Sequence, residues 1–277
     1  MNTKNQLAQK RAGFGTFVEG VIQRECMDFL QSEAAASRLR KLMLDAVPRN
    51  PRILDCSPES VALALMTCAE LNLQPSAALG HVYLIPRYDK KSRGMNLGLI
   101  IGYKGYLELI RRNCDVKNIY AGVAFRGEDF TISVDSDGPT IRHAPSLEDV
   151  DRSPEAVLAS YVIIKMKSGA TYCEWCSRSE ILERRAASGS RGFSPWKTHF
   201  TRMARKCAIR KLVDGGTLPL IDDVARANHI EMKAELQAVQ DAPEPTTERF
   251  QPLPACDAPP VEGLFDAPED EPEHNEE

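Results

Sequence analysis

His81-Val-Tyr-Leu-Ile-Pro-Arg87 and Met95-Asn-Leu-Gly-Leu-Ile-Ile-Gly102 are the two stretches that decide the fold class. From Gly80 onward the hydrophobic pattern changes from a helical period to the alternation that is typical of strands. The basic loop Asp89-Lys-Lys-Ser-Arg-Gly94 separates the two stretches. The pattern therefore predicts a β-hairpin that follows a helical region.

The segments before this hairpin have helical patterns. Residues 16–30 and 32–47 are predicted helices, and Pro48 ends the second of them. Ser57-Pro-Glu59 supplies a capping side chain, a proline at the first helical position and a carboxylate in the first turn. A third helix is therefore predicted to begin there.

The chain beyond the hairpin mixes strands with single helices. A helix is predicted at about 103–113, and a final helix runs from Pro195 to about Val213. Strands are predicted near 117–125, 129–134, 157–167 and 170–176, and Ser168-Gly169 marks a tight turn. This order favours an α+β fold in which a small antiparallel sheet is packed and crossed by helices.

Charge divides the chain into a basic body and an acidic tail. The 277 residues carry a formal net charge of -4, but twelve acids and a single base, Arg249, follow residue 240. The body, residues 1–240, therefore holds 34 Lys and Arg against 27 Asp and Glu. A basic body points to a polyanionic partner.

The tail, residues 241–277, is predicted to be disordered. It contains eight of the 18 prolines and repels itself through its like charges, so it cannot bury a core. Solubilisation, docking of a partner through Gly263-Leu-Phe265, and competition for the basic surface are alternative roles. Before the tail, residues 223–240 are predicted to form a helical extension of a core at 36–222, and residues 1–35 form an N-terminal helical region.

Composition excludes several classes of protein. No stretch reaches the roughly 18 to 20 apolar residues of a membrane span, and the polar N-terminus lacks a signal-peptide pattern. The eight cysteines are scattered along the chain, which is typical of reduced thiols in a reducing compartment and not of a disulfide framework. We therefore expect an intracellular protein without membrane association.

Two predicted helices carry basic faces. Lys104, Arg111 and Arg112 share one face of the helix at 103–113. They could bind a row of DNA phosphates, or they could form a solvated face that is paired with Glu108.

On the last helix, four basic residues form a predicted ridge beside an apolar stripe: His199, Arg202, Lys206 and Arg210. No acid interrupts residues 191–212, which favours contacts with phosphates over a purely solvated face. Trp196 could stack on a base or belong to the core.

Patterns for other chemistry are weak. Cys173 and Cys176 would point to opposite faces of a strand, and the glycine-rich stretch 98–105 matches neither a P-loop nor a dinucleotide fingerprint. His81 and His143 are interpreted as structural. Asp222, Asp223 and Glu231 are the only acids that suggest a nuclease metal site, although a solvated helix explains Glu231 better.

Several segments together resemble a known family over about residues 38–222. They are residues 71–86, Leu99-Ile-Ile-Gly-Tyr-Lys-Gly105 with Arg111-Arg112, Pro195-Trp-Lys-Thr-His199, Met203-Ala-Arg-Lys206 and Ile209-Arg-Lys-Leu212, with weaker likeness at 126–130, at His143 and at 161–167. In order and spacing they resemble the RecT family of phage and prophage single-strand annealing proteins.

The resemblance implies a protein that binds single-stranded DNA and anneals it without ATP. It implies an annealing-protein core, and rings or filaments on single-stranded and annealed DNA in the cytoplasm of a bacterial host. Residues 1–35, which lie outside the likeness, are interpreted as a helical oligomerisation region. A 5'-3' exonuclease and a single-strand-binding protein are the implied partners. No cofactor is implied, and Mg²⁺ is expected at most to modulate DNA binding.

The DNA-contacting candidates are Tyr103, Lys104, Arg111, Arg112, Lys165, Trp196, His199, Arg202, Arg205, Lys206, Arg210 and Lys211. A metal-dependent nuclease and a sequence-specific DNA-binding regulator are the alternatives.

Overall fold

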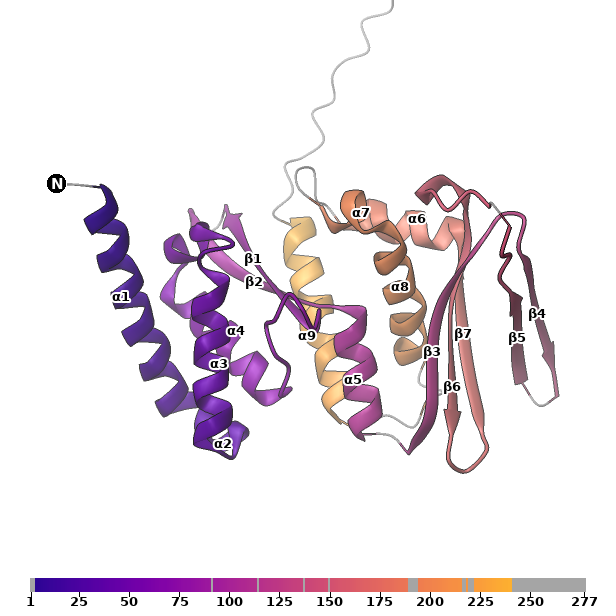
Figure 1. Cartoon of the computed structure of the whole chain (residues 1–277), viewed down its shortest axis with the longest axis horizontal. Coiled ribbons are helices and arrows are strands. Elements are labelled where there is room, and N and C mark those ends of the chain that lie inside the picture. The colour runs from indigo at the N-terminus through magenta and orange to yellow at the C-terminus, as the bar shows by residue number, and fades with distance from the viewer. Residues whose placement is uncertain are drawn as a thin grey trace, which may run out of the picture. The chain divides into compact units, whose positions relative to one another are not determined.

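The computed structural model describes residues 3–90, 92–113, 115–136, 138–148, 150–188, 194–215, 218 and 222–240 (Figure 1). The predicted disordered tail, residues 241–277, lies outside the described residues. No helix of the described part is long and apolar enough to cross a membrane.

Helices form the N-terminal part of the fold. They are α1 (Thr3–Val21), the π-helical turn η1 (Ile22–Cys26), α2 (Met27–Leu30), α3 (Glu33–Ala46), the 3-10 turn η2 (Pro51–Asp55) and α4 (Pro58–Glu70). The Oγ atoms of Ser32 and Ser57 accept backbone hydrogen bonds at the starts of α3 and α4. The predicted helix at 16–30 thus begins earlier, at Thr3, and is interrupted by the π turn. Val18, Ile22, Met43 and Leu65 belong to the core.

The predicted hairpin is confirmed. β1 (Val82–Asp89) and β2 (Gly94–Ile101) pair antiparallel from Val82↔Ile101 to Asp89↔Gly94. α5 (Tyr103–Asn113) follows immediately. A Cβ at Gly102 or Gly105 would collide with the backbone oxygen of Gly80 or His81. The glycine-rich stretch therefore allows the end of β2 and the start of α5 to approach the backbone before β1.

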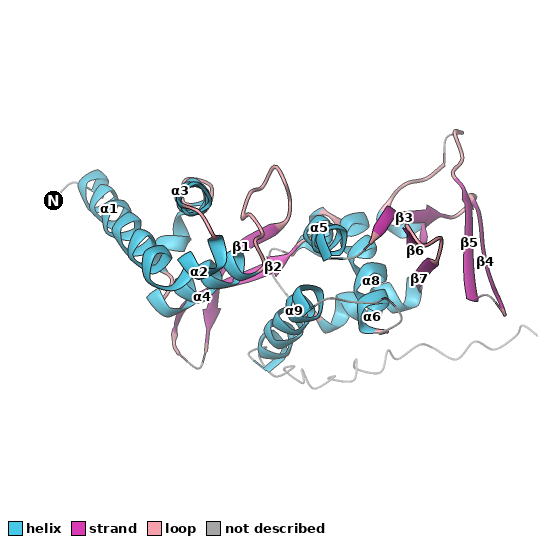
Figure 2. Ribbon diagram, turned by 90° about the horizontal axis from the view of Figure 1, so that it is seen from below, coloured by secondary structure: helices cyan, strands magenta, loops and turns pink. Residues whose placement is uncertain are grey.

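A three-stranded antiparallel sheet forms the second half of the fold. Its strands are β3 (Val116–Phe125), β6 (Val157–Met166) and β7 (Thr171–Ser177), in the order β3-β6-β7. α8 (Phe200–Asp214) packs on β6 and β7, and the hairpin of β4 (Asp129–Asp135) and β5 (Gly138–Ala144) contacts β7. In Figure 2 the sheet lies between α5 and α8 on one side and the β4–β5 hairpin on the other.

The remaining elements join and cover these units. They are the 3-10 turn η3 (Pro154–Ala156), α6 (Arg178–Ala187), α7 (Pro195–Thr198) and α9 (Asp222–Gln240). α9 packs against α5, α8 and β2. The α+β class and the antiparallel pairing are confirmed, although the described strands form three separate sheets rather than one.

The sequence patterns missed two elements and merged two others. Neither β5 nor α6 was expected. The predicted final helix is divided at His199, whose backbone leaves the helical region at φ -140 and ψ 46. This break changes the phase between Trp196 in α7 and the residues of α8.

Candidate nucleic-acid interface

Two of the three candidate cations of α5 lie free of the expected pairing. Lys104 and Arg111 are exposed. Arg112 donates from Nε to Glu108 Oε1 at 2.9 Å and from a terminal nitrogen to the Leu71 carbonyl at 3.2 Å. The predicted pairing with Glu108 is therefore present for Arg112, and Lys104 and Arg111 are the candidates of this helix that lack that pairing.

The ridge predicted on the last helix is wrong for two of its four members. His199 and Arg202 are exposed, as predicted, but Lys206 and Arg210 are only 5% and 7% exposed. Because α9 packs over this face of α8, these two cations point into protein rather than solvent. They are not accessible to a DNA phosphate in this structure.

The Glu231 carboxylate of α9 binds Lys206 and lies close to Arg210. Its Oε1 accepts from Lys206 Nζ and from the Ile101 backbone N–H, both at 2.6 Å. Its Oε2 accepts from the Tyr106 hydroxyl at 3.2 Å and lies 4.0 Å from an Arg210 nitrogen. Glu231 is 3% exposed, so its interpretation as part of a solvated helix is wrong.

One sequence signal could have revealed this cluster. Val224, Ala227, Asn228 and Glu231 follow one another at i, i+3, i+4 and i+7, which places Glu231 on the buried stripe of α9. Arg210 donates from Nε to the Asn228 side-chain oxygen at 3.3 Å. The same arrangement argues against the nuclease alternative, because a carboxylate held by Lys206 is not free to bind a metal ion.

Two further candidate residues also have internal roles. Lys211 donates from Nζ to Glu180 at 2.7 Å and to the Trp175 carbonyl at 3.0 Å. Burial opposes the charge of Lys211, but the hydrogen bond that it donates to Glu180 and the nearby Glu174 carboxylate outweigh the effect of burial and raise the pKa of Lys211. Trp196 is 6% exposed and packs against Phe200, so the structure supports its core interpretation over base stacking.

Arg205 connects the two exposed basic regions. Its guanidinium carbon lies 5.9 Å from the centroid of the Tyr103 ring, a cation–π contact between α8 and α5. Lys104 follows Tyr103, and Arg202 lies one turn before Arg205. We call these residues, with His199, the α5–α8 surface: Tyr103, Lys104, His199, Arg202 and Arg205. Neither helix has an acid in its first turn, so the positive ends of both helix dipoles are unopposed there.

Lys165 lies elsewhere, on β6. It is exposed and pairs in register with Asn118 of β3. The exposed candidates therefore lie in three places: on the α5–α8 surface, in the last turn of α5 at Arg111 and Arg112, and on the sheet at Lys165.

A buried polar cluster joins the β4–β5 hairpin to the sheet. His143 Nε2 lies 3.1 Å from Glu128 Oε2, and His143 Nδ1 lies 2.7 Å from the Tyr161 hydroxyl. If Nε2 donates to the carboxylate, Nδ1 accepts from the hydroxyl. The structural interpretation of His143 is thus supported, and three segments that carry the weaker family likeness meet here.

Glu128 makes this cluster sensitive to acid. Burial raises the pKa of Glu128, but the Phe125 N–H at 2.8 Å, His143 and Arg152 outweigh it and hold the pKa below its usual 4.5. Because the ionised Glu128 carboxylate is stabilised in the folded protein, it contributes to the free energy of unfolding above pH 4.5. This contribution is lost as the pH falls through the lowered pKa of Glu128.

We expect the unfolding free energy of the parent to fall more steeply below pH 4.5 than that of Glu128→Gln. Denaturant unfolding over a pH series measures this, and parallel curves would contradict it.

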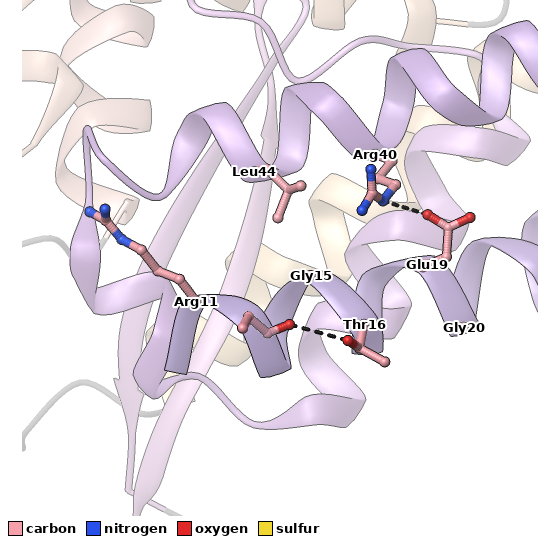
Figure 3. A pocket seen from close by; sticks show the side chains of 8 residues that line it. Arg11, Gly15, Thr16, Glu19, Gly20, Arg40 and Leu44 are labelled. Atoms are coloured by element: carbon pink, nitrogen blue, oxygen red, sulfur yellow. Dashed lines mark hydrogen bonds and ion pairs between the residues drawn. The ribbon is translucent and has the colours of Figure 1, made fainter. Parts of the chain in front are cut away.

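Within the described part of the chain, the other possible sites that we considered carry no comparable chemistry. Cys173 and Cys176 pair with Ile163 and Ser160, an odd spacing that confirms their opposite faces, and no group of three potential metal ligands occurs among the described residues. A hollow of about 580 Å³ lies between α1 and α3 (Figure 3). Arg40 of α3 pairs with Glu19 of α1 in its lining, to which Gly15 and Gly20 of α1 also belong. Its lining of Gly15, Gly20 and one ion pair resembles no catalytic constellation.

Known proteins match this chain over the part that carries the interface. The model of the RecT family matches residues 37–242. Protein RecT of Escherichia coli (strain K12) is 32% identical over 209 residues, which is 75% of this chain and 75% of that protein. The chain belongs to the RecT family.

Membership of the RecT family identifies a DNA-binding protein of phage-type recombination that acts by single-strand annealing. The match includes α5, α8 and α9, so the buried Glu231 cluster lies inside the RecT region and not in an appendage. It begins after α1 and α2.

Proposed function

We propose that this chain binds single-stranded DNA and anneals it to a complementary strand without nucleotide hydrolysis. The observation that carries the proposal is the contact of Arg205 with Tyr103, which joins the exposed cations of α5 and α8 into one surface. Backbone phosphates supply most of the affinity in binding of this kind. The α5–α8 surface is therefore the proposed path of the strand.

Annealing by this route uses electrostatics and geometry instead of bond chemistry. Cations hold one strand by its phosphates and leave base edges free for a second strand. Each matched step then gains about 1.4 kcal/mol of stacking, so pairing itself tests the sequence. No catalytic group or cofactor is required, and Mg²⁺ is proposed only to modulate DNA binding.

The strand path is proposed to continue across neighbouring subunits of a ring or filament. Residues 1–35 are proposed to contribute to this assembly, and exposed Leu7 and Phe29, at 39% and 43%, offer apolar surface there. A 5'-3' exonuclease that exposes the strand and a single-strand-binding protein are the proposed partners. Light scattering with and without oligonucleotide would test the assembly.

The deciding experiment is annealing of two labelled complementary oligonucleotides by the full chain without ATP. Faster pairing of the complementary strands alone, with both strands intact on a denaturing gel, is the expected result. Shortened strands would replace the proposal with the nuclease alternative. Whole strands that pair no faster than unaided would contradict annealing, and binding to particular duplex sites would favour the regulator.

A further inference from the structure

One exposed aromatic side chain, Tyr120, lies outside the α5–α8 surface that forms the proposed strand path. Tyr120 lies on β3, an edge strand of the sheet, and is 55% exposed. Its partner in register is Ile163, and Asn118 pairs with Lys165 two positions away. Because side chains alternate along a strand, Asn118, Tyr120 and Lys165 lie on the same face of the sheet.

This face is opposite to the one that the helices cover. Val162 and Ile164, the alternating neighbours of Ile163, are fully buried, and α8 packs on β6. The β4–β5 hairpin contacts β7 at the other edge of the sheet, where the Cys173 thiol donates to the Pro139 carbonyl. Tyr120 thus lies at the edge of the sheet away from this contact.

The ring of Tyr120 packs against a buried aromatic cluster. Its centroid lies 5.9 Å from that of Tyr161, and the two rings are inclined at 40°. Tyr161 is buried, packs over the Gly122 backbone and lies 5.4 Å from the Phe130 ring. His143 and Glu128 fix its hydroxyl, as described above. The buried cluster therefore positions Tyr120 while leaving much of its ring open to solvent.

Lys165 places a positive charge beside this ring. It is diagonal to Tyr120 across the two strands, a relation in which the two positions are about 7–8 Å apart and long side chains still reach each other. An exposed aromatic face with an adjacent ammonium group is the combination that binds an unpaired nucleotide, because the base stacks and the phosphate meets the charge. A base inside a duplex has both faces covered by its neighbours and cannot use such a ring.

We propose that Tyr120 and Lys165 form a nucleotide subsite for unpaired DNA, in which one base stacks on Tyr120 and a neighbouring phosphate binds Lys165. This inference rests on the proposed function and names a part of the strand that the protein recognises. The subsite favours the single strand over the annealed product. Tyr161, His143 and Glu128 are positioning residues for it.

Equilibrium binding to a fluorescein-labelled dT oligonucleotide tests the subsite in the full chain. Tyr120→Ala is expected to weaken binding about tenfold, within the range that aromatic–base stacking gives, and Tyr120→Phe is expected to bind like the parent. Val134→Ala, which truncates another exposed side chain (68% exposed), is the matched control and should not change affinity. Parental affinity in Tyr120→Ala would overturn the subsite.

A second measurement does not depend on the alanine variant folding. Tyr120→Trp keeps a stacking ring, and its fluorescence above the background of Trp175 and Trp196 is expected to be quenched by the dT oligonucleotide but not by duplex. Binding without quenching would overturn the inference while leaving the proposed function intact. A parent that binds no oligonucleotide would instead overturn the proposed function.

Discussion

Replacing Glu231 by alanine is expected to lower the free energy of unfolding by about 3–5 kcal/mol, the loss typical of breaking a buried ion pair from one side. The variant leaves Lys206 buried without its counter-charge. It also removes the acceptor for the Ile101 N–H and the Tyr106 hydroxyl. A loss of this size is a large fraction of the stability of an ordinary domain, so denaturant unfolding monitored by circular dichroism will detect it.

Two controls separate the ion pair from other effects of the substitution. Met232→Ala changes the next residue of α9, which is 44% exposed, and is expected to alter stability by no more than about 0.5 kcal/mol. Lys206→Met combined with Glu231→Leu removes both members of the Lys206–Glu231 pair, while Arg210 keeps its hydrogen bond to Asn228, and is expected to recover part of the loss. Equal stabilities of Glu231→Ala and Met232→Ala would show that the pair is not buried in solution.

This cluster also changes how variants of Lys206 and Arg210 should be interpreted. Alanine at either position would weaken DNA binding by disturbing the packing of α9 on α8, without removing a phosphate contact. The binding defect would then follow the folded fraction of the protein. Stability must therefore be measured before a binding defect in either variant is assigned to DNA.

The difference between sequence and structure at α8 has a clear physical origin. Helical periodicity shows that Lys206 and Arg210 share a face, but it does not show what covers that face. The cover is Glu231 in α9, about 25 residues later, and only the tertiary fold brings them together. The break at His199 was hidden for a related reason, since every residue from Pro195 to Val213 is compatible with a helix.

Other parts were predictable because local signals and tertiary packing agree. The β1–β2 hairpin and the cap at Ser57 appear as expected, and Phe200 and Cys207, which lie in the apolar stripe beside the predicted ridge, are buried. Tyr120 could not be identified, because an exposed and a buried tyrosine on a strand have the same sequence pattern. Its exposure depends on which edge of the sheet the β4–β5 hairpin contacts.

The exposed cations of the α5–α8 surface should respond differently from the buried pair. Lys104→Ala combined with Arg202→Ala is expected to weaken binding of single-stranded DNA at low salt by more than tenfold, without lowering thermal stability. Each lost phosphate contact also reduces the slope of log affinity against log salt by about 0.7 on a single strand, so the double variant should lose about 1.4. Fluorescence anisotropy at a series of salt concentrations measures both effects.

A charge-matched control shows whether position or net charge decides the result. Lys10 is exposed in α1, pairs with Asp55 and precedes the RecT match, so Lys10→Ala removes one positive charge away from the proposed path. Its salt slope is expected to equal that of the parent, whereas Lys104→Ala alone should already be shallower. If Lys10→Ala and Lys104→Ala change the slope equally, binding responds to the overall charge of the basic body. If neither the single nor the double variant changes the slope, the strand does not follow the α5–α8 surface, because a path held by phosphates must lose counterion release when its cations are removed.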